Sequence, residues 1–440
     1  MKVLVVGAGA REHALVHALS ADPEVSALHA APGNPGIAAS AEVHPLADAG
    51  DGAQVARLAH DLAVDLVIIG PEAPLVAGVA DAVRSRGIAC FGPSAQAARL
   101  EGSKAFAKDV MAAAGVPTAM AHVCTSMEEV APALDALGAP YVVKDDGLAA
   151  GKGVVVTDNR MTALAHAAQC LNRASAPGEQ PPAVVIEEYL DGPEVSLFCV
   201  TDGRTVVPLA PAQDFKRALD GDEGPNTGGM GAYSPLDWAP AGLVEEVVSR
   251  VAQPTIDEMA RRGTPFVGIL YVGLALTSRG TRVVEFNARF GDPETQVVLA
   301  RLATPLSTLL YAAATGSLSD LPPLRWRQEY AVTVVIAAKG YPDGPRKGDP
   351  IEGIDAVTGG AYVLHAGTAL AGEQLVSAGG RVLSVVATGT DLAAARARAY
   401  AAVDAVRLRG GHHRTDIALA AEEGRVAVPT GPASASPDAG

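Results

Sequence analysis

The chain has 440 residues, of which 49% are hydrophobic and 19% are charged, and its formal net charge is -15. This apolar content is sufficient for folded cores, so the composition excludes an intrinsically disordered protein. The acidic balance argues against a general nucleic-acid-binding surface, which needs a basic face, although local lysines and arginines can still bind small anions.

The sequence has no feature typical of a membrane or secreted protein. No apolar run reaches the roughly 18 residues that a membrane-spanning helix needs. The apolar run after Lys2 could resemble a signal peptide, but Arg11, Glu12 and His13 interrupt it too early. The four cysteines are dispersed without a CxxC pair, which indicates reduced, buried thiols rather than zinc ligands or disulfides. We therefore expect a cytoplasmic protein, a monomer rather than an oligomer, with no membrane or nucleic-acid partner.

The N-terminal segment alternates strand and helix patterns. Apolar runs predict strands over residues 2–6, 63–69 and 87–91, and helical spacing predicts a helix over 11–20. This βαβ rhythm is typical of a parallel sheet covered by helices. We therefore expect an N-terminal α/β domain over residues 1–102.

A glycine-rich turn follows the first strand. Gly7, Gly9 and Glu12 resemble the dinucleotide fingerprint GxGxxG, but Glu12 replaces the third glycine. The acidic residue that binds a ribose, about twenty positions further on, is also missing. The backbone N–H groups of this turn and the N-terminus of the next helix can still bind an anion. We therefore predict a phosphate-monoester site that includes Arg11, with the alternative that the glycines serve only tight packing.

Two further turns lie at the carboxyl ends of predicted strands, where open parallel sheets bind ligands. The candidate substrate-binding positions that they contribute are Asn34, Pro35, Gly36, Pro71 and Glu72. The N-terminal domain is therefore expected to bind an anionic substrate along one edge of its sheet.

The middle of the chain begins with a lysine-bearing helix and continues mainly as strands. The helix is predicted over residues 103–114, with Lys104 and Lys108 one turn apart on one face. The strand patterns YVVK, VVVT and VVIEEYL then dominate residues 140–194, with a helical stretch over 162–173 between them.

A glycine-rich segment, KDDGLAAGKG, lies between the strands YVVK and VVVT. It is not a P-loop, because three residues rather than four separate Gly147 from Gly151, Gly153 stands where Ser or Thr is required, and a strand follows. We predict a hairpin flap whose backbone covers nucleotide phosphates while Lys144 reaches them from the strand beneath. The alternative is a mobile hairpin with a solvated Lys152.

The strand VVIEEYL ends in acidic residues and a glycine turn. Its carboxylates and backbone could present hydrogen-bonding groups to an adenine and its ribose, although an ordinary strand end looks the same. The candidate nucleotide-binding positions are Glu187, Glu188, Leu190 and Glu194.

The segment VVEFNARFGDPETQ, residues 283–296, has the clearest chemical pattern in the chain. Side chains alternate faces along a strand, which predicts an apolar face made of Val284, Phe286 and Ala288. The opposite face then consists of Glu285, Asn287 and Arg289. Carboxylate and amide oxygens with a fixed cation suit a Mg²⁺–polyphosphate site, whereas the alternative is an ordinary half-exposed strand.

The C-terminal part predicts a further unit of sheet and helix. It has the strand patterns YAVTVVIAAK, GAYVLHAG and RVLSVVATG, followed by a helix over residues 391–408. We expect a central domain over 103–325 with a flap at about 120–192. A C-terminal cap over 326–428 and a disordered tail over 429–440 follow, because the tail is small, polar and rich in Pro and Gly.

The order of these features resembles the ATP-grasp fold: a lysine before a helix, a strand lysine with a glycine flap, an acidic strand end, and Glu-x-Asn. Over residues 1–428 the chain is similar to the glycinamide ribonucleotide synthetase (phosphoribosylamine–glycine ligase) family. The shared motifs are GAGAREHAL, APGNPG, GPEAPL, GPS, KDDGLAAGKGV, NTGGMGAYSP and RFGDPETQ, of which the last two are specific to it. The chain departs from the family pattern at Ala10, Asp145 and Phe215, where the family usually has Gly, Ala and His.

This resemblance implies the fold and the reaction. The expected fold is a Rossmann-like parallel-sheet domain, an ATP-grasp domain with its flap, and a sheet-plus-helix cap. The expected reaction, in de novo purine biosynthesis, joins glycine to 5-phosphoribosylamine through glycyl phosphate, with ATP as co-substrate and Mg²⁺ or Mn²⁺ as the metal. A sister ATP-grasp ligase that uses formate or bicarbonate is the main alternative. An NAD-linked oxidoreductase and a binding protein without catalysis are the others.

The resemblance also implies roles for individual residues. Glu285 and Asn287 would hold the metal, and Arg289 would contact the acyl phosphate or the glycine carboxylate. Asp214 and Lys216 would act on the phosphoribosylamine side. The residues expected to bind the ATP phosphates, either as cations or through the closing flap, are Lys104, Lys144, Gly147, Gly151, Lys152 and Gly153.

Overall fold

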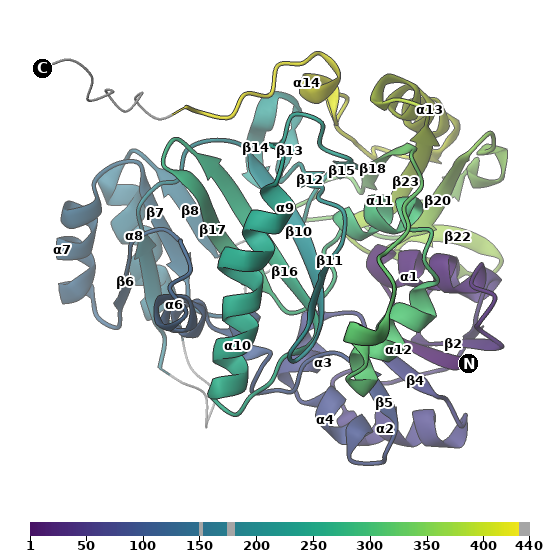
Figure 1. The fold of residues 1–440 in the computed structure, drawn as a ribbon. Coiled ribbons are helices and arrows are strands. Elements are labelled where there is room, and N and C mark those ends of the chain that lie inside the picture. The colour runs from purple at the N-terminus through teal and green to yellow at the C-terminus, as the bar shows by residue number, and fades with distance from the viewer. Residues whose placement is uncertain (149–152, 174–180, 431–440) are drawn as a thin grey trace, which may run out of the picture.

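The computed structural model describes residues 1–148, 153–173 and 181–430. Four larger sheets organise the described residues: a parallel N-terminal sheet, a central antiparallel sheet, a flap sheet and a C-terminal sheet. In Figure 1 the flap lies on the left, the central sheet in the middle, the N-terminal domain at the lower right and the C-terminal sheet at the upper right. Within the described residues, none of the helices has the length and apolar character needed to cross a membrane.

The N-terminal sheet is fully parallel and has the strand order β3-β2-β1-β4-β5. Its strands are β1 (Lys2–Gly7), β2 (Ala27–Pro32), β3 (Glu42–Val43), β4 (Leu66–Ile69) and β5 (Ala89–Phe91). Its helices are α1 (Ala10–Ser20), α2 (Gly52–Asp61), α3 (Glu72–Val76), α4 (Val79–Arg84) and α5 (Arg99–Gly102). The predicted parallel sheet is therefore confirmed, although β4 begins three residues later than expected because Ala63 has a positive φ of 50°.

The central sheet is antiparallel and has the order β11-β10-β16-β17. Its strands are β10 (Glu194–Asp202), β11 (Val206–Pro208), β16 (Val267–Thr277) and β17 (Gly280–Asn287). The helices of this region are α6 (Lys104–Ala113), α9 (Leu243–Val247), α10 (Gln253–Arg261), α11 (Glu294–Arg301) and α12 (Leu306–Thr315). Helix α10 runs across the front of the sheet in Figure 1, and α12 contacts both β5 and β10. Helix α12 thereby joins the N-terminal and central sheets.

Strand β17 differs from the predicted alternation. The register between β16 and β17 shifts at Gly273 and Leu274, which leaves Val284 without a partner as a bulge residue. The buried apolar side chains of this stretch are therefore Val283, Phe286 and Ala288, whereas Val284 is only half-buried. The prediction for Val284 was wrong because a strict alternation of faces cannot anticipate an inserted residue.

The flap is a small domain with its own apolar core. Its sheet has the order β6-β9-β7-β8, and two helices, α7 (Met127–Leu137) and α8 (Arg160–Leu171), pack against it. The strands are β6 (Ala121–Cys124), β7 (Tyr141–Asp145), β8 (Val154–Thr157) and β9 (Val184–Glu187). Strands β7 and β8 pair antiparallel, which confirms the predicted hairpin. Gly151 and Lys152 lie outside the described residues.

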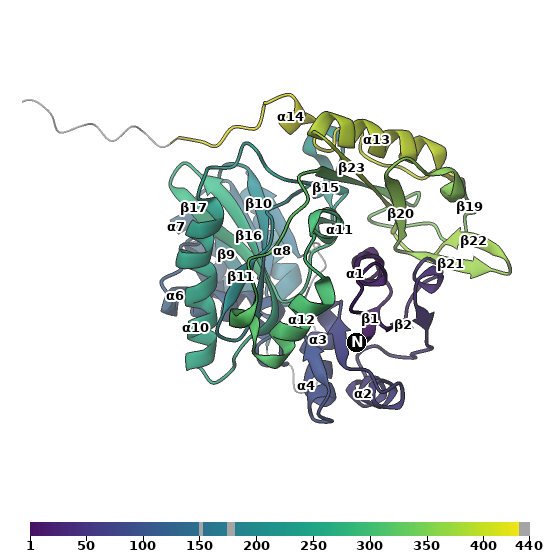
Figure 2. The same cartoon turned by 45° about the vertical axis from the view of Figure 1, so that its right-hand side comes forward.

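The C-terminal sheet combines strands from two parts of the chain. Its order is β12-β15-β18-β23-β20, and helix α13 (Leu392–Ala405) packs on it. The strands are β12 (Gln213–Asp214), β15 (Gly231–Ser234), β18 (Tyr330–Ala337), β20 (Ala361–His365) and β23 (Arg381–Gly389). Because β12 and β15 belong to the central segment, this sheet extends beyond the residues expected to form the cap. Helix α1 of the N-terminal domain contacts β20 and α11, as Figure 2 shows.

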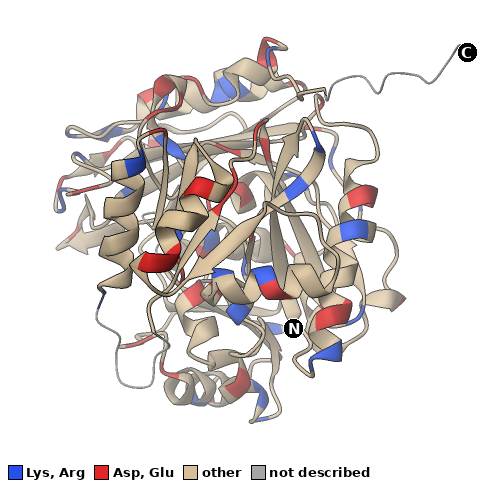
Figure 3. Ribbon diagram, turned by 90° about the vertical axis from the view of Figure 1, so that its left-hand side faces the viewer, with Lys and Arg blue, Asp and Glu red and all other residues tan. Residues whose placement is uncertain are grey.

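Short paired strands and one further α-helix also belong to the described chain. They are β13 (Arg217–Leu219), β14 (Glu223–Asn226), β19 (Ile351–Glu352), β21 (Thr368–Ala371), β22 (Gln374–Ser377), β24 (Arg407–Leu408) and α14 (Leu419–Glu422). Helix α13 was predicted to reach residue 408, but it ends at Ala405 because the residues that follow form β24, which pairs with β19. Charged residues of both signs are interspersed along the elements that Figure 3 shows from one side.

The loop before β15 docks on the loop before α11 through Gly229. This residue has a φ of +109°, and a Cβ added there would lie 2.4 Å from Cδ of Pro293. We predict that Gly229→Ala lowers the free energy of unfolding by about 3 kcal/mol, because backbone strain and a steric clash combine. Gly221→Ala is the matched control, since Gly221 has a φ of +69° with nothing within 4 Å. Equal losses of stability in urea unfolding would contradict this account.

Candidate active site

The polar residues of β17 form the centre of the candidate site. Nδ2 of Asn287 lies 3.4 Å from Oε1 of Glu285, so the two side chains share one face of the strand. Glu285 stands opposite Gly273 on β16, where an added Cβ would come within 3.2 Å of Cγ of Glu285. Gly273 thus leaves room for the carboxylate. Nζ of Lys144 donates to the backbone oxygen of Val284 at 3.3 Å, which brings the flap onto the same strand.

Cations surround Glu285. Burial alone raises the pKa of Glu285, but the charges of Lys216, Lys144, Lys104 and Arg289 outweigh burial and hold this pKa below its usual value. Glu285 is therefore ionised at neutral pH. Burial lowers the pKa of the Lys104 ammonium, although the nearby Glu285 carboxylate works against this. The structure thus collects positive charge around one carboxylate, as a site for a polyanion requires.

Two lysines share one buried carboxylate behind this centre. Oε2 of Glu187 lies 2.6 Å from Nζ of Lys144, and its Oε1 lies 2.8 Å from Nζ of Lys108. Burial would raise the pKa of Glu187, but these two lysines lower it overall. Glu187 therefore fixes the position of Lys144. The sequence pattern placed Lys108 beside Lys104 on one helix face but gave Lys108 no role. The ion pair between Lys108 and Glu187 forms only in the folded protein, where the flap approaches this helix.

Glu188 connects the flap to the central sheet. Its Oε1 accepts a hydrogen bond from the backbone N–H of Met120 at 2.9 Å, and its Oε2 lies 2.8 Å from Nη2 of Arg279. The carboxylates of Glu187 and Glu188 are thus both bound to protein groups. Their predicted contacts with a nucleotide stay a prediction.

The base of the flap is attached to Lys104. Nζ of Lys104 donates to the backbone oxygens of Asp145 at 2.8 Å and Gly147 at 2.9 Å. The Asp145 carboxylate is directed elsewhere, with Oδ2 at 2.5 Å from Nη1 of Arg173. This ion pair explains how the chain accommodates an acid at a position where the family usually has Ala: the added negative charge has its own cation.

Arg289 is held by carboxylates from the N-terminal domain. Its Nη2 lies 2.9 Å from Oε1 of Glu101, and its Nε lies 3.2 Å from Oε2 of Glu72. Arg11 approaches the same Glu72 oxygen at 3.8 Å. Burial lowers the pKa of Arg289, but Glu101 and Glu72 raise it overall, so the guanidinium is a permanent cation. Sequence reasoning found Arg289, Glu72 and Arg11 but missed Glu101, which lies in an ordinary short helix.

Asp214 and Lys216 lie within electrostatic reach of Glu285. Lys216 forms an ion pair with Glu194, which the sequence had assigned to the nucleotide. Burial is the main cause that raises the pKa of Asp214 to about 8. The positive charge of Lys216 lowers this pKa, whereas nearby carboxylates raise it, namely Glu294, Glu194 and Glu285. Phe215, between them, packs against Arg414, whose Cζ lies 5.0 Å from the ring centroid.

A buried hydrogen-bonded group supports this side of the site. Oγ of Ser196 lies 2.7 Å from the hydroxyl oxygen of Tyr271 and donates to Oε1 of Glu294 at 3.1 Å. Glu294 belongs to the motif RFGDPETQ, yet its partner Ser196 comes from β10, and Ser196 in turn contacts Tyr271 of β16. The sequence therefore could not identify this group.

The side chain of Glu12 organises the glycine-rich turn after β1. The backbone N–H of Gly9 donates to Oε2 of Glu12 at 2.6 Å, so a carboxylate of the protein itself occupies the N-terminus of α1. A Cβ at Gly7 or Gly70 would lie 2.5 Å or 2.1 Å from atoms of the Glu12 side chain. These glycines make room for Glu12, and the phosphate site at this turn stays a prediction. Nη1 of Arg11 donates to the backbone oxygen of Gly70 at 2.9 Å.

A cavity of about 420 Å³ lies where the N-terminal and C-terminal domains meet. Its lining residues are Ala8, Gly9, Gly33, Asn34, Asp292, Ala366, Gly367, Thr368 and Arg381. Nδ2 of Asn34 donates to the backbone oxygens of Ala8 at 2.8 Å and His365 at 3.0 Å. Nη2 of Arg381 lies 3.1 Å from Oδ2 of Asp292. Sequence reasoning found Gly9 and Asn34 but missed Arg381, because an arginine at a strand start usually faces solvent.

The positions of Pro35, Gly36 and Pro71 follow from their neighbours. Oδ1 of Asn34 accepts hydrogen bonds from the backbone N–H groups of Gly36 and Ile37, both at 2.9 Å, which fixes this turn after β2. Pro71 precedes α3 as its N-cap residue. Both turns lie at strand carboxyl ends, as predicted.

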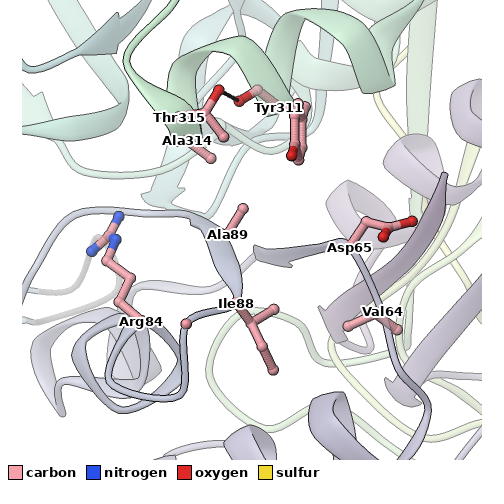
Figure 4. A pocket seen from close by; sticks show the side chains of 9 residues that line it. Val64, Asp65, Arg84, Ile88, Ala89, Tyr311, Ala314 and Thr315 are labelled. Carbon is pink, nitrogen blue, oxygen red and sulfur yellow. Dashed lines mark hydrogen bonds between the residues drawn. The ribbon is translucent and has the colours of Figure 1, made fainter.

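A second cavity, of about 460 Å³, lies between α12 and the region of β5. Figure 4 shows its lining side chains, among them Arg84, Tyr311 and Thr315. Arg84 is already committed to the fold, because its Nη2 donates to the backbone oxygen of Cys90 at 2.9 Å. None of the residues predicted for the site lines this cavity.

Comparison with known proteins identifies first the class and then the family. A family model of the phosphoribosylglycinamide synthetase ATP-grasp (A) domain matches residues 102–295. Models of the N domain and the C domain of the same synthetase match residues 1–101 and 331–420. The central region is thus an ATP-grasp domain, a fold that binds ATP. The chain belongs to the phosphoribosylglycinamide synthetase family, which confirms the resemblance and the expected fold class.

Individual relatives agree with this assignment. The phosphoribosylamine–glycine ligase of Streptomyces coelicolor is 68% identical and is aligned over 96% of this chain and 99% of its own length. That of Mycobacterium tuberculosis is 58% identical over 97% of this chain and its full length. The crystal structure of the Thermotoga maritima ligase has a TM-score of 0.81 at 33% identity and covers 95% of this chain and 100% of its own. A Hydrogenobacter thermophilus biotin carboxylase domain, with a TM-score of 0.73 over 94% of this chain and 91% of its own at 17% identity, shares the fold alone.

The raised pKa of Asp214 makes a prediction about stability. When a carboxyl group has a higher pKa in the folded protein than in the unfolded chain, the folded protein loses stability as the pH rises from the lower pKa to the higher one. Because Asp214 titrates at about 8, the wild type should lose stability relative to Asp214→Asn as pH rises to about 8, with no further change above it. The melting temperatures of both proteins across this range provide the measurement. Parallel curves would contradict the raised pKa.

Proposed function

We propose that the chain uses Mg·ATP to phosphorylate the glycine carboxylate and then joins glycyl phosphate to 5-phosphoribosylamine, giving glycinamide ribonucleotide, ADP and phosphate. The chain is an ATP-dependent ligase with phosphoribosylamine–glycine ligase activity in purine biosynthesis, as its full-length relatives indicate. The observation that carries the mechanism is the convergence of Lys104, Lys144, Lys216 and Arg289 on Glu285.

The donor set at β17 fits a hard divalent ion. Glu285 offers an ionised carboxylate, and Asn287 offers an amide oxygen on the same strand face. Oxygen ligands of this kind suit Mg²⁺ and also Mn²⁺. The ion, when bound to Glu285 and Asn287, would neutralise charge on the ATP phosphates as the terminal phosphoryl group moves.

The cations around the transferred phosphoryl group have different roles. Lys104 and Lys144 bind ATP phosphates, and their positions are set by flap carbonyls and by Glu187. Arg289, held by Glu72 and Glu101, contacts the carboxylate that becomes the acyl phosphate. Its rigid support is important because a fixed charge does not have to reorganise as the transition state forms.

The flap excludes water from the reactive intermediate. Gly147, Gly151, Lys152 and Gly153 cover the phosphates in this proposal, since water would hydrolyse an acyl phosphate. The acidic strand end, with Glu188, Leu190 and Glu194, borders the nucleotide. We also propose a division into an N-terminal domain (1–102), a central domain (103–325) with its flap at about 120–192, a C-terminal cap (326–428) and a tail (429–440). Residues 431–440 of this tail lie outside the described residues.

The phosphoribosylamine is proposed to bind between the domains. Its phosphate would occupy the cavity near Gly9, Asn34 and Arg381, with Gly7, Arg11, Glu12, Pro35, Gly36, Pro71 and Glu72 around it. Asp214 and Lys216 would orient the amine that attacks the glycyl carbonyl. The attack forms the C–N bond and breaks the C–O bond to phosphate, which leaves as inorganic phosphate. A cytoplasmic location and a monomeric state remain predictions.

The joint requirement for both ligated substrates and the metal ion tests the function directly. ADP release should depend jointly on glycine, phosphoribosylamine and Mg²⁺, because the acyl phosphate forms only on glycine and is consumed only by the amine. ADP release with formate or bicarbonate in place of glycine would favour the sister ligase. A complete lack of ADP release would favour a binding protein without catalysis.

Removal of the proposed metal ligand should abolish turnover. We predict that Glu285→Ala lowers kcat by at least about a hundredfold, because charge on the phosphates is no longer neutralised, while the protein remains folded. Glu352→Ala is the matched control, since this exposed strand carboxylate lies in β19. ADP production near the wild-type rate in Glu285→Ala would remove Glu285 from the metal site.

Arg381 should affect one substrate more than the others. We predict that Arg381→Ala raises the KM for phosphoribosylamine about tenfold or more, because a charged hydrogen bond to the substrate phosphate is lost. The KM values for ATP and glycine should change much less. Arg407→Ala, at an exposed arginine of the same domain, serves as the control. An equal rise in all three KM values would assign Arg381 to domain structure alone.

A further inference from the structure

Three potential metal ligands meet at the edge of the N-terminal sheet. Strands β2 and β3 pair in parallel there, with His29 directly opposite Glu42. His44 follows two residues after Glu42, and its backbone N–H donates to the oxygen of Ala30 at 2.9 Å, so the extended pairing continues. Because side chains alternate along a strand, Glu42 and His44 lie on the same face, next to His29.

The distances between the ligand atoms match those around a single metal ion. Nδ1 of His29 lies 3.1 Å from Nε2 of His44 and 3.5 Å from Oε2 of Glu42. Nε2 of His44 lies 3.8 Å from Oε1 of Glu42. In a tetrahedral zinc site with bonds of about 2.0–2.1 Å, neighbouring ligand atoms are about 3.3 Å apart. An ion therefore fits between these atoms with small side-chain movements.

The three side chains differ in exposure in a way that suits metal binding. The side chains of His29 and His44 are only 10% and 15% exposed, so packing restricts their rings. The Glu42 side chain is 67% exposed and can complete the site from the solvent side. Three protein ligands leave a fourth position for water.

We propose that His29, Glu42 and His44 bind one divalent transition-metal ion of the zinc class. Imidazole nitrogens favour zinc, cobalt, nickel and copper, whereas Mg²⁺ favours oxygen, so this site is chemically distinct from the one proposed at Glu285 and Asn287. The competing explanation is a hydrogen bond between two histidines beside a surface carboxylate, which has no affinity for metal.

Such an ion would join the two ends of a loop that reaches the inter-domain cavity. Residues 33–41 connect β2 to β3, and Gly33 and Asn34 in this loop line that cavity. Gly33 also packs on β3, since a Cβ added there would lie 3.0 Å from Cγ2 of Val43. The ion would therefore stabilise the loop and raise the melting temperature.

Titration of the chelator-treated, full-length protein with Co²⁺, in excess Mg²⁺, tests this site. The wild type should bind one equivalent and develop the visible absorption of four-coordinate Co²⁺, and Zn²⁺ should displace it and raise the melting temperature. Glu42→Gln and His44→Ala should each weaken Co²⁺ binding by more than the roughly 10–100-fold that loss of an outer-shell partner costs. Glu42 is exposed, so Glu42→Gln remains informative if His44→Ala fails to fold.

His60→Ala is the matched control, because the exposed His60 lies on helix α2 of the same domain and forms an ion pair with Asp61. It should bind Co²⁺ like the wild type. Lack of Co²⁺ binding in the wild type would overturn the proposal, and so would equal binding in the wild type, Glu42→Gln and His44→Ala.

Discussion

The candidate active site is built around the attraction between four cations and a single carboxylate, Glu285. Lys104, Lys144, Lys216 and Arg289 all act on Glu285, and together they keep it ionised. Buried cations are costly unless each has a partner. The protein meets this requirement with carboxylates and carbonyls from other elements: Glu187 holds Lys144, Glu101 and Glu72 hold Arg289, and flap carbonyls hold Lys104. The site is therefore organised before a substrate arrives, and the electrostatic cost of assembling it is met during folding.

The same interactions connect the domains. Arg289, two residues after β17, reaches carboxylates of α3 and α5, and Asn34 donates a hydrogen bond to the backbone of His365 in β20. The C-terminal sheet includes β12 and β15, so the strand that carries Asp214 belongs to a different sheet from the strand that carries Glu285. The candidate active site thus lies where several sheets meet. This arrangement explains why a reaction with three substrates can be served by one chain.

Local sequence patterns predicted much of this fold and part of the site. The parallel N-terminal sheet, the flap hairpin and the polar face of β17 follow from short patterns of apolar residues and glycines. The bulge at Val284 could not be predicted, because one inserted residue changes the register without changing composition. Glu101 and Arg381 were missed, and so was the pairing of Lys108 with Glu187, since each of these roles depends on residues far away in sequence. The turn at Gly9 was only partly anticipated, because its glycines also make room for the Glu12 side chain, whose carboxylate accepts a hydrogen bond from Gly9.

The central claim is that the glycine carboxylate is activated as an acyl phosphate in the charged centre at Glu285. Glycine labelled with oxygen-18 in its carboxylate tests this claim most directly, with mass spectrometry of the inorganic phosphate released in the complete reaction. If glycyl phosphate forms, the amine displaces phosphate through the C–O bond, and one labelled oxygen appears in each phosphate. Phosphate without the label, at the same yield of glycinamide ribonucleotide, would contradict the account.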